Sequence, residues 1–156
     1  MECINAVGRN AREDQPKDAR SAPKRIIPRV LLADDQEEIR RAVASILEDE
    51  FEIVGVAENG TQVLDLVIER LPDILVLDIV MPMLNGIETA ARLKASGCPA
   101  KVLFVSAHED ADFVDSAMSV GALGYVSKAH LATDLIPGIR SVMENQIYIS
   151  PTLLSA

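Results

Sequence analysis

Short apolar runs alternate along this chain with longer segments whose apolar residues recur at helical spacing. The apolar runs are residues 30–33, 51–57, 74–77, 102–105 and 123–126. The helical segments between and after them are residues 36–49, 61–70, 87–96, 110–119 and 131–145. Short buried strands that alternate with amphipathic helices are typical of a parallel sheet with helices on both faces. We therefore predict a single, doubly wound α/β fold with five parallel strands.

The last predicted helix contains Pro137 followed by Gly138. Proline in a helix interior removes a hydrogen bond and costs about 3 kcal/mol or more. Two interpretations stay open: the regular helix begins at Pro137 as a first-turn residue, or a longer helix is kinked there.

The predicted folded domain covers residues 29–145. Residues 1–28 contain three prolines and no apolar period, and we expect a flexible leader. Residues 146–156 are expected to be a C-terminal tail or the start of a linker.

Composition and charge exclude several classes of protein. No apolar stretch is long enough to cross a bilayer, and the first residues do not resemble a signal peptide. Two cysteines in different settings, Cys3 and Cys98, disfavour a disulfide scaffold and suit a reducing cytoplasm. The net charge is −9, although Lys and Arg outnumber Asp and Glu in residues 1–29. The acidic remainder argues against direct nucleic-acid binding.

Chemically active side chains stand where the predicted strands end. Asp34 and Asp35 close the first run, Asp78 closes the third, Ser106 closes the fourth, and Lys128 follows the fifth. The carboxyl ends of parallel strands share one edge of a sheet, where α/β folds bind ligands. Crowded carboxylates repel one another unless a cation balances them. This set predicts a Mg²⁺ site with an oxyanion bridging the metal and Lys128.

These motifs resemble the receiver domain of two-component response regulators. The resemblance covers about residues 28–145 and rests on residues 31–35 (LLADD), 77–86 (LDIVMPMLNG), 105–107 (VSA) and 127–129 (SKA). The SKA string, which has no proline after the lysine, is similar to the NarL/FixJ-like subgroup. The fold implied is the flavodoxin-like receiver fold.

The resemblance implies a role for each residue of the set. Asp78 would be the phosphoacceptor, and Lys128 and Ser106 would each contact a phosphoryl oxygen. Mg²⁺ would be bound by Asp35, Asp78 and the backbone carbonyl of Val80, with Asp34 acting mainly through water. Such a site supplies the positioning and charge neutralisation that phosphoryl transfer needs.

The resemblance also implies a switch and its partners. Ser106 would move toward the phosphoryl group, and Tyr125 would rotate inward behind it. The surface of the fourth helix, fifth strand and fifth helix would then change. The expected phosphodonor is a histidine kinase or a phosphotransfer protein, and the expected reader is a partner or a second copy of the chain. His108, two residues beyond Ser106, is a candidate influence on dephosphorylation.

Two other functions are less compatible with this sequence. A Mg²⁺-dependent phosphatase of the haloacid dehalogenase type also uses an Asp nucleophile, but its two aspartates are separated by one residue after the first strand. Here the pair is adjacent, and the expected nucleophile follows the third strand. An interaction module that needs no phosphorylation is disfavoured by the intact acidic set. We therefore expect a signalling protein that is not a metabolic enzyme.

The NarL/FixJ-like subgroup usually carries a helix-turn-helix domain after the receiver. Residues 147–151 resemble the start of the linker to such a domain. Two expectations follow: a stand-alone receiver, or one truncated from a DNA-binding regulator.

Overall fold

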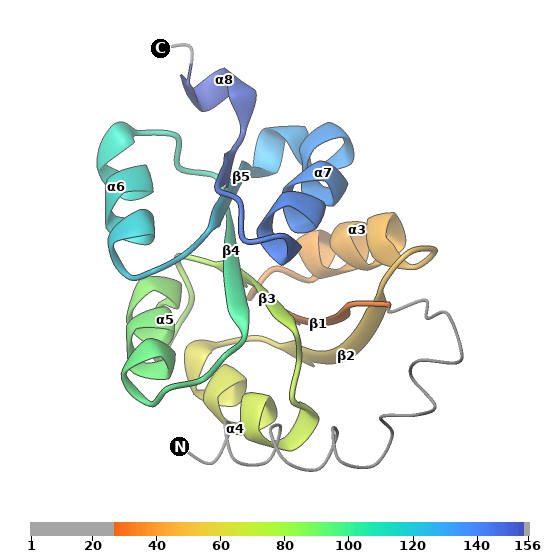
Figure 1. Ribbon diagram of the computed structural model, residues 1–156, viewed down its shortest axis with the longest axis vertical. Helices are drawn as coiled ribbons and strands as arrows, with labels where there is room; N and C mark the ends of the chain where they lie inside the picture. The colour runs from red at the N-terminus through yellow and green to blue at the C-terminus, as the bar shows by residue number, and fades with distance from the viewer. Residues whose placement is uncertain (1–26, 155–156) are drawn as a thin grey trace.

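A computed structural model describes residues 27–154, which form one parallel sheet wrapped by helices (Figure 1). The strands follow the order β2-β1-β3-β4-β5-β6, and every neighbouring pair is parallel. The strands are β1 (Arg29–Ala33), β2 (Glu52–Ala57), β3 (Ile74–Asp78), β4 (Lys101–Ser106), β5 (Gly124–Ser127) and β6 (Tyr148–Ile149). The helices are α3 (Glu37–Leu47), α4 (Gly60–Arg70), α5 (Gly86–Ala95), α6 (Ala111–Ser119), α7 (Leu131–Met143) and α8 (Pro151–Leu154), with a 3₁₀ turn, η1 (Lys128–His130), before α7. The predicted parallel α/β fold is confirmed.

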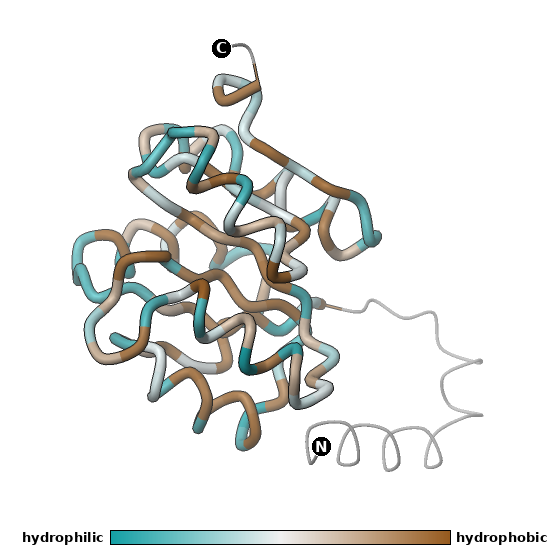
Figure 2. The backbone as a smooth tube through the Cα atoms, turned by 90° about the vertical axis from the view of Figure 1, so that its left-hand side faces the viewer, coloured by the Kyte–Doolittle hydropathy of each residue, from teal (hydrophilic) through white to brown (hydrophobic). Residues whose placement is uncertain are grey.

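Successive side chains of each central strand enter two different cores. Leu31 and Leu75 pack with α4, α5 and α6, whereas Val30 and Ile74 pack with α3 and α7. This division is why the strand sequences are apolar at consecutive positions instead of alternating with polar ones. In Figure 2 the backbone segments that cross the centre of the molecule are mostly hydrophobic, whereas many of the hydrophilic segments lie at its periphery.

Asparagine side chains fix the beginnings of two helices. The side chain of Asn59 accepts a hydrogen bond from the backbone N–H of Gln62 at the start of α4. Asn85 accepts in the same way from Glu88 at the start of α5. Each bond satisfies an N–H that has no partner within its own helix. The cap at Asn85 ends the loop after β3 and therefore helps to position the carboxyl end of that strand.

The C-terminal part of the fold decides one point that the sequence left open and differs from the prediction in another. Helix α7 begins at Leu131 and continues through Pro137, so the helix does not start at the proline. Residues that were expected to lie in the tail form a sixth strand, β6, followed by the short helix α8. Strand β6 could not be predicted from local sequence, because two residues are too few to show a strand period.

Most of the expected leader, residues 1–26, lies outside the part of the chain that the structure describes. Within residues 27–154, none of the helices has both the length and the apolar character that a membrane span requires.

Candidate functional site

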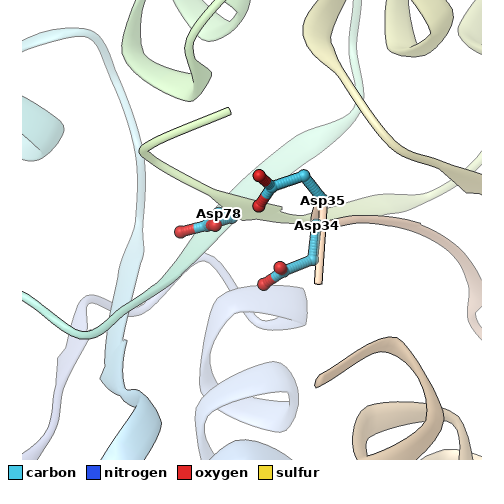
Figure 3. A group of neighbouring side chains, drawn as sticks. All are labelled: Asp34, Asp35 and Asp78. Atoms are coloured by element: carbon cyan, nitrogen blue, oxygen red, sulfur yellow. The ribbon is translucent and has the colours of Figure 1, made fainter. Parts of the chain in front are cut away.

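Three aspartates meet at the carboxyl edge of the sheet. Asp34 and Asp35 directly follow β1, and Asp78 is the last residue of the neighbouring strand β3. One carboxylate oxygen from each lies within 4.8 Å of the others. Figure 3 shows the three side chains extending from the ends of their strands toward a common space. Asp34 and Asp78 are buried, whereas Asp35 is exposed.

Lys128 reaches this cluster from the end of β5. Its Nζ lies 2.9 Å from Oδ2 of Asp34 and 3.2 Å from Oδ2 of Asp78. It also donates a hydrogen bond of 3.3 Å to Oε1 of Gln36. The ammonium group therefore bridges the two buried carboxylates and offsets part of their mutual repulsion.

Burial and charge act in opposite directions on the titration of these groups. Burial and the neighbouring Asp34 carboxylate raise the pKa of Asp78 to about 6, although Lys128 opposes this. Burial lowers the pKa of Lys128, but the hydrogen bond to Asp34 and the charges of Asp78 and Asp34 outweigh it and raise that pKa overall. Lys128 thus compensates the negative charge of Asp78 only in part. This favours the binding of a cation beside Asp78, or a covalent modification of its carboxylate.

A pocket of about 220 Å³ opens over Asp78. Asp35, Val80 and Lys128 line it, together with Gln36, Ala107 and His108. Carboxylates at this spacing are hard oxygen ligands of the kind that Mg²⁺ prefers, and the pocket leaves room for the waters that Mg²⁺ retains. The donor set and the space therefore fit a magnesium ion.

Gly86 brings the start of α5 against the backbone of Asp78. Its N–H donates a hydrogen bond of 2.7 Å to the carbonyl oxygen of Ile79. A β-carbon at position 86 would overlap the carbonyl oxygen of Asp78. Only glycine permits this approach, which fixes the peptide that carries the Asp78 side chain.

Ser106 lies beneath the pocket instead of lining it. Its side chain is fully buried, and its Oγ accepts a hydrogen bond of 2.9 Å from the N–H of His108. Tyr125 is fully buried as well, and its hydroxyl donates to the carbonyl oxygen of His108 at 2.7 Å. The Tyr125 side chain thus lies inside the molecule in this structure, and its rotation on phosphorylation stays a prediction. The His108 ring stacks on Phe113 with centroids 4.1 Å apart.

The structure brings together Asp34, Asp35, Asp78 and Lys128, and it places Val80 at the pocket rim. Sequence reasoning did not identify Gln36, whose side chain contacts Lys128 and whose N–H donates to Oδ1 of Asp34 at 2.9 Å. The only signal for it is its place directly after the aspartate pair.

Residues 30–140 match the response regulator receiver domain family, and the chain belongs to this family. Receiver domains are signalling modules of two-component systems, and they are not metabolic enzymes. This family match gives no support to the alternative of a haloacid dehalogenase-type phosphatase.

Individual relatives agree with this assignment. The transcriptional regulatory protein DegU of Brevibacillus brevis is 36% identical over 124 residues, which are 78% of this chain and 52% of DegU. The chemotaxis protein CheY of Halobacterium salinarum is 34% identical over 114 residues, covering 73% of this chain and 95% of CheY. A two-component response regulator of the LuxR family from Aurantimonas has a similar structure, with a TM-score of 0.79 and 26% identity over 83% of this chain and 94% of that one.

The relatives and structural neighbours include NarL- and LuxR-type regulators, which supports the predicted NarL/FixJ-like subgroup. The chain spans about three-fifths of the length of several curated relatives and little more than half of DegU.

Proposed function

We propose that this receiver accepts a phosphoryl group on Asp78 from a histidine kinase or a phosphotransfer protein. One observation carries the proposal: the Asp78 carboxylate lies at the base of an open pocket, paired with Lys128 at 3.2 Å and close to two further carboxylates. Receiver domains exchange phosphoryl groups with proteins of these two kinds, and the same arrangement here supports that role. The proposed compartment is the cytoplasm, which a sequence with two isolated cysteines suits.

In the proposed reaction, an Asp78 carboxylate oxygen attacks the phosphorus of a phosphohistidine. The new O–P bond forms as the P–N bond breaks, and the imidazole leaves with the electron pair and takes up a proton. Lys128 shifts from its carboxylate partners to a phosphoryl oxygen and stabilises the charge there. Ser106 donates a hydrogen bond to another phosphoryl oxygen once its Oγ turns away from the His108 N–H.

Asp35, Asp78 and the backbone carbonyl of Val80 would hold Mg²⁺, with Asp34 acting through water. The ion would neutralise charge on the carboxylates and the phosphoryl oxygens. The Gln36 N–H donates to one oxygen of Asp34 at 2.9 Å, and Lys128 Nζ lies 2.9 Å from the other, so the orientation of this carboxylate beside the pocket is fixed.

The proposed output is a change in the surface of α6, β5 and α7, read by a partner or a second copy of the chain. The hydrogen bonds from His108 to Ser106 and from Tyr125 to His108 link this surface to the site. Slow hydrolysis of the aspartyl phosphate would reset the protein, and His108 at the pocket rim is placed to influence the approach of water.

The decisive test is incubation with Mg²⁺ and a small phosphodonor, followed by intact-mass measurement. We expect one phosphoryl group on the wild type and none on Asp78→Asn. An equal mass gain in the variant would place the phosphoacceptor elsewhere. Sustained release of phosphate from small phosphomonoesters would instead support a phosphatase.

Association is tested separately, by light scattering with and without beryllofluoride as a phosphoryl mimic. We expect the mimic to increase the molar mass toward that of a dimer. An unchanged mass would reject phosphorylation-dependent dimerisation while leaving the phosphoacceptor assignment in place.

A further inference from the structure

After α7 the chain returns to the sheet and covers the edge of β5. We call residues 148–154, which comprise β6 and α8, the strap. The N–H groups of Tyr148 and Ser150 donate to the carbonyl oxygens of Leu123 and Tyr125, both at 2.9 Å. In Figure 1 this dark-blue end of the chain passes between α6 and α7. The strap therefore lies in the middle of the α6–β5–α7 surface that the proposed function assigns to partners.

A buried polar cluster, which we call the clasp, holds the strap in place. The clasp consists of Ser127 on β5, Asp134 on α7 and Ser150 in the strap, all of them buried. Ser150 Oγ accepts from the N–H of Ser127 at 3.0 Å and donates to Oδ2 of Asp134 at 2.7 Å. The other Asp134 oxygen accepts from the hydroxyl of Thr133 at 3.1 Å. A buried carboxylate needs such donors, so displacement of Ser150 leaves both an acceptor and a backbone donor without protein partners.

The clasp is connected to the pocket through the strand end and the adjoining loop. Ser127 directly precedes Lys128, whose ammonium group lies in the carboxylate cluster. The Ser127 hydroxyl donates to Glu109 at 2.7 Å. Glu109 in turn follows His108, whose N–H is bonded to Ser106. A rearrangement of either Lys128 or the loop after β4 thus acts on the residue that anchors the strap.

We propose that the strap is a displaceable cover on the α6–β5–α7 surface, closed by the clasp and loosened by phosphorylation. When Ser106 turns toward a phosphoryl oxygen, its bond to the His108 N–H is lost and the support of Glu109 for Ser127 weakens. Lys128 moves at the same time and displaces the neighbouring Ser127 N–H from Ser150. The strap then exchanges between closed and open positions more often, and the face beneath it becomes accessible.

The closing role of the clasp is tested without any phosphodonor, by hydrogen exchange in the full chain. In Ser150→Ala, the amides of Tyr148 and Ser150 lose the anchoring side chain, and we expect them to exchange about tenfold faster. Asp134→Asn keeps the shape of the side chain but removes the charge that accepts from Ser150. We expect it, too, to accelerate hydrogen exchange at Tyr148 and Ser150. The control is Ser45→Ala, at an exposed position on α3. In this variant we expect hydrogen exchange at the strap to equal that of the wild type. Wild-type exchange in both clasp variants would overturn the proposal.

The coupling to phosphorylation depends on the proposed function and is tested with beryllofluoride and Mg²⁺. Fluorine NMR first establishes that the mimic is bound, and exchange at Tyr148 and Ser150 is then expected to accelerate. By linkage, Ser150→Ala should bind beryllofluoride severalfold more tightly than wild type or Ser45→Ala. Bound mimic with unchanged exchange and unchanged affinity would overturn the coupling alone. Failure of the mimic to bind any variant would contradict the phosphoacceptor assignment as well.

Discussion

At the scale of single residues, the balance of charge around Asp78 determines its behaviour. Two buried carboxylates share one ammonium group, since Lys128 contacts both Asp34 and Asp78. This shared partner leaves the pKa of Asp78 at about 6, raised first by burial and then by the charge of Asp34. The negative charge of Asp78 is therefore only partly compensated, and a bound cation or conversion to an aspartyl phosphate would change this balance of charge.

This raised pKa predicts how stability depends on pH in the absence of metal. Between pH 3.8 and about 6 the folded protein retains a proton on Asp78 that the unfolded chain has lost. Stability contributed by this group is therefore present at low pH and declines as pH rises through that window. At pH 7, Asp78→Asn should raise the free energy of unfolding by about 2–3 kcal/mol, because the amide carries no charge to bury.

Urea unfolding in EDTA at a series of pH values measures this difference. The gain from Asp78→Asn should be small at pH 4 and should grow until about pH 7. Equal shifts at all pH values would show that the burial of charge at position 78 is not the cause.

At the scale of elements, the junction between β3 and α5 fixes the site. Gly86→Ala would force its new β-carbon against the carbonyl of Asp78. We expect a loss of about 2 kcal/mol in stability from overpacking, together with slower phosphorylation, because the peptide bearing Asp78 must shift.

Chemical denaturation and intact-mass kinetics with a small phosphodonor measure the two effects of Gly86→Ala. The matched control is Ala91→Gly, at an exposed position of the same helix, which should lose about 1 kcal/mol through helix propensity while keeping the wild-type phosphorylation rate. Wild-type phosphorylation in Gly86→Ala would show that the close approach does not position Asp78.

Pro137 lies within α7 and leaves the carbonyl of Thr133 without the usual helical donor. Pro137 is exposed, so its replacement disturbs little packing. Pro137→Ala should raise the free energy of unfolding by about 1–3 kcal/mol, reduced somewhat because proline also restricts the unfolded chain. Thermal and urea unfolding both measure this. An unchanged or lower stability would indicate that α7 accommodates the proline without cost.

Periodicity and strand-end chemistry were sufficient to predict the parallel sheet and to place Asp34, Asp35, Asp78 and Lys128 on one edge. They could not predict β6, because its pairing depends on an edge that exists only in the folded sheet. The bridging position of Lys128 between two carboxylates and its contact with Gln36 could not be predicted either. These features depend on side-chain rotamers and on the packing of segments that are distant in sequence.

At the scale of the whole molecule, metal binding should be visible as stability. A ligand that binds only the folded state stabilises it by about 2.7 kcal/mol at a concentration 100 times its Kd. We therefore expect Mg²⁺ to raise the Tm of the wild type and to have little effect on Asp35→Ala, which lacks the exposed carboxylate at the pocket.

Thermal scans with and without Mg²⁺ test this expectation. The control is Glu37→Gln, which removes a nearby acid from the first turn of α3 and should retain the wild-type response to Mg²⁺. A full response in Asp35→Ala would exclude Asp35 as a ligand.

The two borders of the sheet differ in length. One border is β2, six residues long, with Val56 half exposed, and the other is β6, only two residues long. A strand of two residues offers almost no backbone groups for pairing with a strand of another molecule, whereas a strand of six residues offers several. Within the described residues 27–154, the closed strap therefore protects one border of the sheet against pairing with a strand of another molecule, and opening of the strap would expose the four-residue β5 in its place.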